Sequence, residues 1–88
     1  MKASSDYILR QVADVNMLLP VGQAVLNFNG MIVLNESGSF LWRRMSQETT
    51  REALAEALMS EYNASCDIAL QDVDDFLAVL RNANCLID

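Results

Sequence analysis

The spacing of apolar residues changes at Asn35, and this change constrains the fold more than any other feature of the sequence. Before Asn35, short apolar runs are separated by turn-forming residues, which is typical of strands. After it, apolar residues recur three or four positions apart, which is typical of helices. A group of strands followed by a group of helices predicts an α+β fold.

The first third of the chain predicts an antiparallel sheet of three or four short strands. Strand signals occupy residues 7–12, 15–19, 23–28 and 31–34. Ala13 and Asp14 form the expected turn between the first two strands, and Pro20 ends the second. Asn29-Gly30 stands between two apolar runs, which is the strongest short signal for a two-residue hairpin.

Three helices are expected after Asn35, around residues 40–45, over 50–62 and over 69–83. Either Asn35 or Ser37 supplies the oxygen that caps the first helix. Thr49 and Glu52 have the spacing of a capping box for the second. Residues 85–87 form an apolar tail that returns to the core. Two helices joined by a short loop and followed by such a tail predict a winged helix-turn-helix arrangement.

The chain is short and acidic, with 88 residues and a net charge of −6. We therefore expect residues 1–88 to form a single domain. The third helix carries Asp72, Asp74 and Asp75 against Arg81. Because phosphates repel such a surface, the sequence argues against binding to nucleic acid. Neither a signal peptide nor an apolar run long enough to span a bilayer is visible, so a cytoplasmic location is expected.

The residues that usually carry catalysis or bind metals are scarce. Histidine is absent, and the only cysteines are Cys66 and Cys85, which together do not complete a zinc site. Asp72 and Asp75 share a helix face, but the pattern gives no sign that either is buried, and carboxylates are favoured at a helix start. We therefore expect a protein that is not an enzyme and has no catalytic residue, cofactor or metal.

A peptide-binding groove is the most specific expectation. Residues 31–34 form the last strand before the helices, and a last strand at a sheet edge pairs readily with an extended peptide. Asp72, Val79 and Ala83 lie beside Phe76 on the third helix, and Val79 and Ala83 widen its apolar stripe. The pattern fits a second interpretation equally well, in which Val79 and Ala83 contact the C-terminal tail.

Four blocks of the sequence resemble the PqqD family, the pyrroloquinoline quinone synthesis protein D and its relatives. They are residues 34–42 (LNESGSFLW), 52–62 (EALAEALMSEY), 72–77 (DVDDFL) and 85–87 (CLI), in the family's order and at similar spacing. The resemblance implies three strands followed by three helices. It also implies a peptide-recognition domain that binds the leader of a ribosomally made precursor peptide as an added strand.

The family resemblance implies partners and a binding site. The partners are the leader peptide and a modifying enzyme, often a radical S-adenosylmethionine enzyme. The leader would lie between the third strand and the third helix. The residues expected to bind it are Met31, Ile32, Val33, Leu34, Asp72, Asp75, Phe76, Val79 and Ala83.

Two further hypotheses remain open from the sequence. One is a winged-helix module that regulates transcription or binds another protein, for which we find no basic face. The other concerns assembly, because an open edge strand also permits a homodimer.

Overall fold

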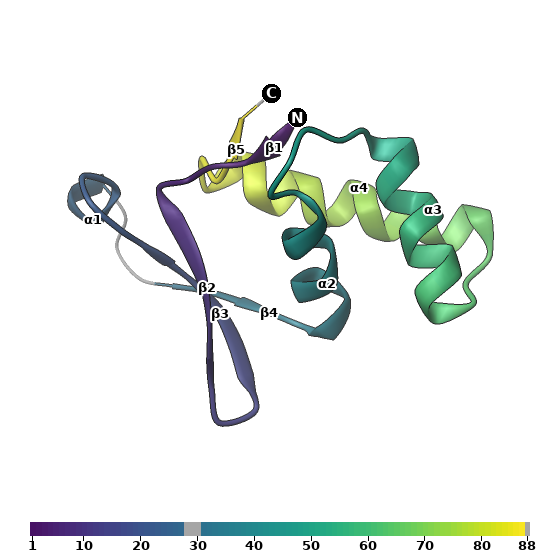
Figure 1. The fold of residues 1–88 in the computed structure, drawn as a ribbon, viewed down its shortest axis with the longest axis horizontal. Helices are drawn as coiled ribbons and strands as arrows, with labels where there is room; N and C mark the ends of the chain where they lie inside the picture. The colour runs from purple at the N-terminus through teal and green to yellow at the C-terminus, as the bar shows by residue number, and fades with distance from the viewer. Residues whose placement is uncertain (28–30, 88) are drawn as a thin grey trace.

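The computed structural model describes residues 1–27 and 31–87 and has an α+β fold (Figure 1). A three-stranded antiparallel sheet has the order β2-β3-β4, and a separate two-stranded sheet joins the two ends of the chain. The elements in chain order are β1 (Lys2–Ala3), β2 (Tyr7–Val12), β3 (Val15–Pro20), α1 (Ala24–Asn27), β4 (Ile32–Leu34), α2 (Glu36–Arg44), α3 (Arg51–Tyr62), α4 (Cys66–Asn82) and β5 (Leu86–Ile87).

The pairing of β2, β3 and β4 follows the predicted alternation. Leu9 pairs with Leu18, and Leu18 pairs with Ile32, so these residues share the face that packs on the helices. The turn at Ala13 and Asp14 joins β2 to β3, as predicted, and Ala13 has φ of 55°. The α+β prediction is thus confirmed, while the winged helix-turn-helix arrangement stays a prediction.

The strand expected over residues 23–28 is wrong. The short helix α1 (Ala24–Asn27) stands there, and β3 pairs directly with β4, which leaves no place for a strand between them. Pro20 ends β3, and Gly22 then turns the chain with φ of 60°, a conformation that costs glycine little. The hairpin predicted at Asn29-Gly30 lies outside the described residues.

One predicted cap is confirmed, one is corrected, and the third helix starts at a residue for which no cap was predicted. Asn35 caps α2, because its Oδ1 accepts a hydrogen bond from the Gly38 N–H at 2.8 Å. Thr50, not Thr49, caps α3, because its hydroxyl accepts a hydrogen bond from the Ala53 N–H at 3.1 Å. Helix α4 starts earlier than predicted, because the Ser65 hydroxyl accepts from the Ile68 N–H at 3.3 Å.

The core lies between the sheet and the three long helices. Its side chains include Leu18 from β3, Leu41 from α2, Leu54 from α3 and Leu80 from α4, all of which are buried. The C-terminal tail returns to this core, as predicted, and the Cys85 N–H donates to the Leu80 carbonyl at 2.9 Å. Strand β5 then pairs with β1, a strand too short for the sequence to indicate.

Truncation of the core should destabilise the protein strongly. Leu80 is fully buried, whereas Val79, its neighbour on α4, is 47% exposed. We expect Leu80→Ala to lower the free energy of unfolding by about 2–5 kcal/mol, because the substitution leaves a cavity. The control Val79→Ala should change it by no more than about 0.5 kcal/mol. Urea denaturation measures both values, and equal effects would contradict the described packing.

The two cysteines should differ in reactivity. Both are free thiols, Cys66 exposed and Cys85 buried. Burial raises the pKa of the Cys85 thiol to about 11. Because the thiolate is the nucleophile, we expect iodoacetamide at pH 8 to alkylate Cys66 and to spare Cys85 until denaturant is added. Intact-mass spectrometry of the wild type and of Cys66→Ser counts the labels, and rapid labelling of folded Cys66→Ser would contradict the burial of Cys85.

Candidate functional site

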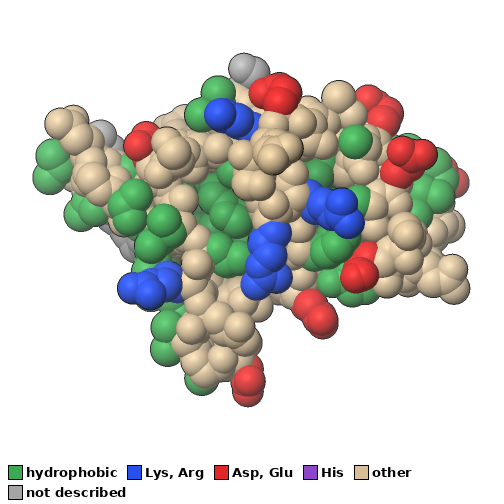
Figure 2. Space-filling view, in the orientation of Figure 1, with side chains coloured by type: hydrophobic (Ala, Val, Ile, Leu, Met, Phe, Trp, Pro, Cys, Tyr) green, Lys and Arg blue, Asp and Glu red, His purple; other side chains and the backbone are tan. Residues whose placement is uncertain are grey.

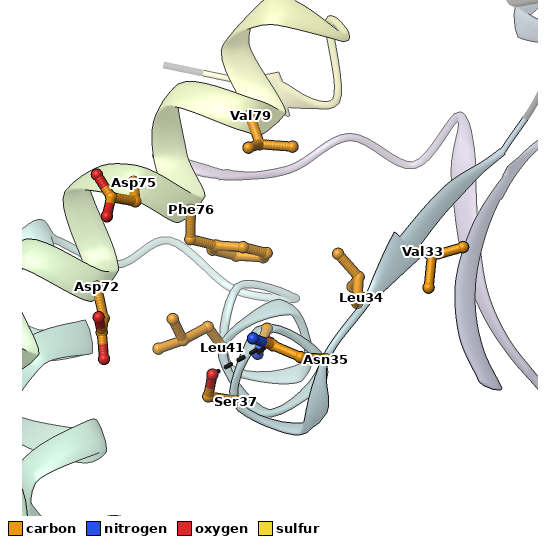
Figure 3. A pocket seen from close by; sticks show the side chains of 10 residues that line it. Val33, Leu34, Asn35, Ser37, Leu41, Asp72, Asp75, Phe76 and Val79 are labelled. Carbon is orange, nitrogen blue, oxygen red and sulfur yellow. Dashed lines mark hydrogen bonds between the residues drawn. The ribbon is translucent and has the colours of Figure 1, made fainter. Parts of the chain in front are cut away.

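A groove of about 550 Å³ runs between β4 and α4, and we call it the edge groove. Val33 and Leu34 lie on its strand side, while Phe76 and Val79 project from α4 on the other (Figure 3). The start of α2 forms the floor between them. The full lining is Val33, Leu34, Asn35, Ser37, Gly38, Leu41, Asp72, Asp75, Phe76 and Val79.

Strand β4 is an edge strand, and the pairing of β2 with β3 determines which of its backbone groups point outward. The Val21 N–H donates to the Asp6 carbonyl at 2.8 Å, so the odd-numbered residues of β3 direct their backbone groups toward β2. The even-numbered Asn16 and Leu18 then direct theirs toward β4, where their partners are Leu34 and Ile32. The N–H and C=O of Val33, between those partners, therefore point away from β3.

No strand of the described residues pairs with this outer side of β4. An extended chain placed there would meet the N–H and C=O of Val33. Part of the interaction therefore needs no particular side chain on the bound chain.

The walls of the edge groove are apolar where they face each other. Phe76 is half-buried and points into the space between α4 and β4 (Figure 3). Gly38 allows α2 to approach this ring, because an added Cβ would lie 3.4 Å from Phe76 Cε1 and 3.0 Å from Asn35 Oδ1. Val79 is 47% exposed, which leaves apolar surface available at the open end. These surfaces suit aliphatic or aromatic side chains of a bound chain.

The α4 side of the groove is negatively charged. Asp72 and Asp75 are exposed and line it, and the Gln71 amide donates to Asp75 Oδ1 at 2.9 Å. Lysine and arginine are absent from the described lining. The charge of this wall therefore favours a cation on the bound chain.

Asp74 takes no part in the groove, although it lies beside Asp75 in the sequence. Arg51 of α3 donates to both of its carboxylate oxygens, at 2.5 and 2.9 Å. This hydrogen bonding lowers the pKa of the Asp74 carboxyl and raises the pKa of the Arg51 guanidinium. The pair joins α3 to α4 and leaves Asp72 and Asp75 as the carboxylates of the groove.

The edge groove brings together most of the residues that the sequence predicted for peptide binding, namely Val33, Leu34, Asp72, Asp75, Phe76 and Val79. Met31, Ile32 and Ala83 lie outside its lining. The side chain of Ile32 packs against the core. Ala83 follows α4 as its C-cap, and its carbonyl accepts a hydrogen bond from the Tyr7 hydroxyl at 3.3 Å. The C-terminal tail pairs with β1 and does not line the groove.

Sequence reasoning missed the part of the lining that comes from the start of α2, which is Asn35, Ser37, Gly38 and Leu41. The sequence did indicate Asn35 or Ser37 as the cap of this helix, and in the structure Asn35 Oδ1 accepts from the Gly38 N–H and, at 3.1 Å, from the Ser37 hydroxyl. A cap fixes where a helix starts, and here that start lies directly beside the edge strand.

The groups of the edge groove are those that hold an extended peptide: free backbone N–H and C=O, apolar walls and fixed charge. In the described residues, no three His, Cys, Asp or Glu side chains are grouped so as to hold a metal ion. None of the helices over residues 1–27 and 31–87 has the length and apolar content needed to cross a membrane.

Comparison with known proteins agrees with this fold. A solved structure, "TbiB1 in Complex with the TbiA(beta) Leader Peptide", is similar over 100% of both chains, with a TM-score of 0.77 and 23% sequence identity. No curated protein sequence matches the chain. The family model described as "Coenzyme PQQ synthesis protein D (PqqD)" matches residues 17–86. Since that match spans most of the chain, the protein belongs to the PqqD family.

Proposed function

We propose that this protein binds the leader segment of a ribosomally made precursor peptide and presents it to a modifying enzyme. The observation that carries the proposal is the unpaired edge of β4, which faces an apolar wall of α4 across the edge groove. The similar structure of TbiB1 holds a leader peptide, which supports the same class of ligand here.

The leader binds as an additional strand beside β4. The backbone of the leader forms hydrogen bonds with the N–H and C=O of Val33, which do not pair with β3. Side chains of a strand alternate between its two faces, so every second side chain of the leader enters the groove. Apolar side chains at these positions contact Phe76 and Val79. The leader motif is therefore a short alternating run and not a single anchor residue.

Charge adds a second element of specificity. Asp72 and Asp75 line the groove one helical turn apart. A lysine or arginine of the leader that faces α4 pairs with them, and the exposure of both carboxylates makes this attraction sensitive to salt. The apolar contacts then supply most of the affinity, and the acidic wall favours leaders with a lysine or arginine that faces α4.

The protein acts as an adaptor and not as an enzyme. The groove supplies binding groups, and the modifying enzyme, for example a radical S-adenosylmethionine enzyme, supplies the chemistry. A homodimer that forms through β4 would use the same backbone groups as the leader, so leader binding and that dimer exclude each other.

Removal of one edge N–H should weaken leader binding strongly. We expect Val33→Pro to weaken binding of the cognate leader at least about tenfold, since proline removes the N–H and places its ring at the pairing edge. The fold should survive because Val33 does not donate to β3. Calorimetric titration measures the affinity, and circular dichroism checks the fold.

The matched control for this substitution is Val33→Ala, which keeps the N–H and removes most of the side chain. It should leave the affinity within about threefold of the wild type. If Val33→Pro folds and binds the leader as tightly as Val33→Ala, strand addition at β4 is wrong.

The acidic wall should contribute affinity that depends on salt. We expect Asp72→Asn/Asp75→Asn to weaken binding of a leader that carries lysine or arginine and to flatten the dependence of its affinity on sodium chloride. Asp14→Asn/Glu56→Gln, at two exposed positions outside the groove lining, controls for the change of two in net charge. Titrations between 50 and 500 mM salt measure the slope, and an unchanged slope in the double variant would exclude pairing with the leader.

A further inference from the structure

A second hollow, of about 660 Å³, lies between the β2–β3 hairpin, β1 and the end of α2, and we call it the N-terminal hollow. Tyr7, Leu9 and Trp42 give it an apolar interior. Figure 2 shows hydrophobic side chains in the region between β1, β2 and α2, with Lys and Arg side chains gathered around them. None of these residues lines the edge groove.

The charge of the N-terminal hollow is opposite to that of the protein as a whole. Lys2 and Arg43 line it, and its described lining contains no aspartate or glutamate. This is notable in a chain with 12 acidic residues against 6 basic ones. The edge groove has the reverse composition, with Asp72 and Asp75 and no cation in its described lining. The hollow therefore suits an anionic occupant with an apolar side chain.

The wall of the hollow also contains a polar group in need of a partner. Asn16 lines it from β3, and its Oδ1 is shielded from solvent without a hydrogen-bond partner in the described part of the chain. Such a group lowers stability unless a donor reaches it.

Helix α2 separates the two cavities and allows both to be filled at once. Gly38 and Leu41 face the edge groove, whereas Trp42 and Arg43 face the N-terminal hollow. At 100° per residue these two pairs lie roughly 120° apart around the helix axis. An occupant of the hollow therefore leaves the backbone edge of β4 open.

We propose that the N-terminal hollow docks an acidic segment, with an aromatic or aliphatic side chain at its centre, of the enzyme that receives the leader. This inference rests on the proposed function, because only a leader adaptor needs to hold peptide and enzyme together. The basic rim selects the acidic residues of the segment, and Tyr7, Leu9 and Trp42 receive its apolar side chain.

The first test uses a defined peptide and no leader. The acetylated, amidated peptide Asp-Glu-Trp-Glu-Asp is titrated into the ¹⁵N-labelled protein and compared with its neutral analogue Asn-Gln-Trp-Gln-Asn. We expect the acidic peptide to shift the amide signals of Leu9 and Trp42, to leave those of Val33 and Val79 in place, and to bind at least about fivefold more tightly than the analogue.

Charge reversal then identifies the rim. Lys2→Glu/Arg43→Glu should abolish the shifts, and Lys2→Gln/Arg43→Gln serves the same purpose if the reversed variant does not fold. Arg10→Glu/Arg81→Glu is the matched control, because it reverses two charges outside the lining of the hollow, on the opposite face of the sheet and on α4. Equal binding of the neutral analogue, shifts centred on the edge groove, or unchanged binding in the charge variants would each overturn the proposal. If the amide signals of residues that line the hollow shift when the protein alone is diluted, the occupant of the hollow is a second copy of the chain instead.

The second test uses the modifying enzyme and the cognate leader. In Lys2→Glu/Arg43→Glu we expect wild-type affinity for the leader and at least about tenfold weaker affinity for the enzyme, measured by surface plasmon resonance. Unchanged affinity for the enzyme overturns the docking site. Failure of the wild type to bind the leader refutes the proposed function instead, and the peptide titration still decides whether the hollow binds acidic segments.

Discussion

The pairing of β4 with β3 is the interaction on which the rest of the structure depends. Ile32 and Leu34 use their backbone groups on Leu18 and Asn16, and this fixes Val33 with its N–H and C=O outward. The same pairing places Asn35 where it caps α2, so the start of that helix lies beside the strand. One short ladder thus positions the edge, the floor and, through Gly38 and Phe76, the opposite wall of the groove.

Local patterns in the sequence predict much of this fold. The alternation in β2 and the stripe of α4 are visible because each depends on residues close together in the chain, and the return of the tail is visible in its apolar composition. The prediction of a strand over 23–28 is wrong because it relied on a local pattern alone. Its apolar pattern is compatible with a strand, but Pro20 and Gly22 divert the chain, and β3 has already paired with β4.

The site was predictable to a similar degree. An edge strand and a widened helix stripe were sufficient to select Val33, Phe76 and Val79. The contribution of Gly38 and Leu41 was not, because it depends on how closely α2 packs against α4, which no local pattern records. Ala83 lies outside the groove because α4 ends just before it. The Ala83 carbonyl instead accepts a hydrogen bond from the Tyr7 hydroxyl.

The β1–β5 pair has a consequence for how this domain can be built into larger proteins. Lys2 lies opposite Ile87, so the chain enters and leaves the domain at adjacent strands, separated by about 4.8 Å. A host protein needs only a narrow gap in a surface loop to accept the whole domain as an insertion. A circular permutant is equally compatible with the fold. In it, a few glycines join the present ends, and the new ends lie in the loop at Asn63, between α3 and α4.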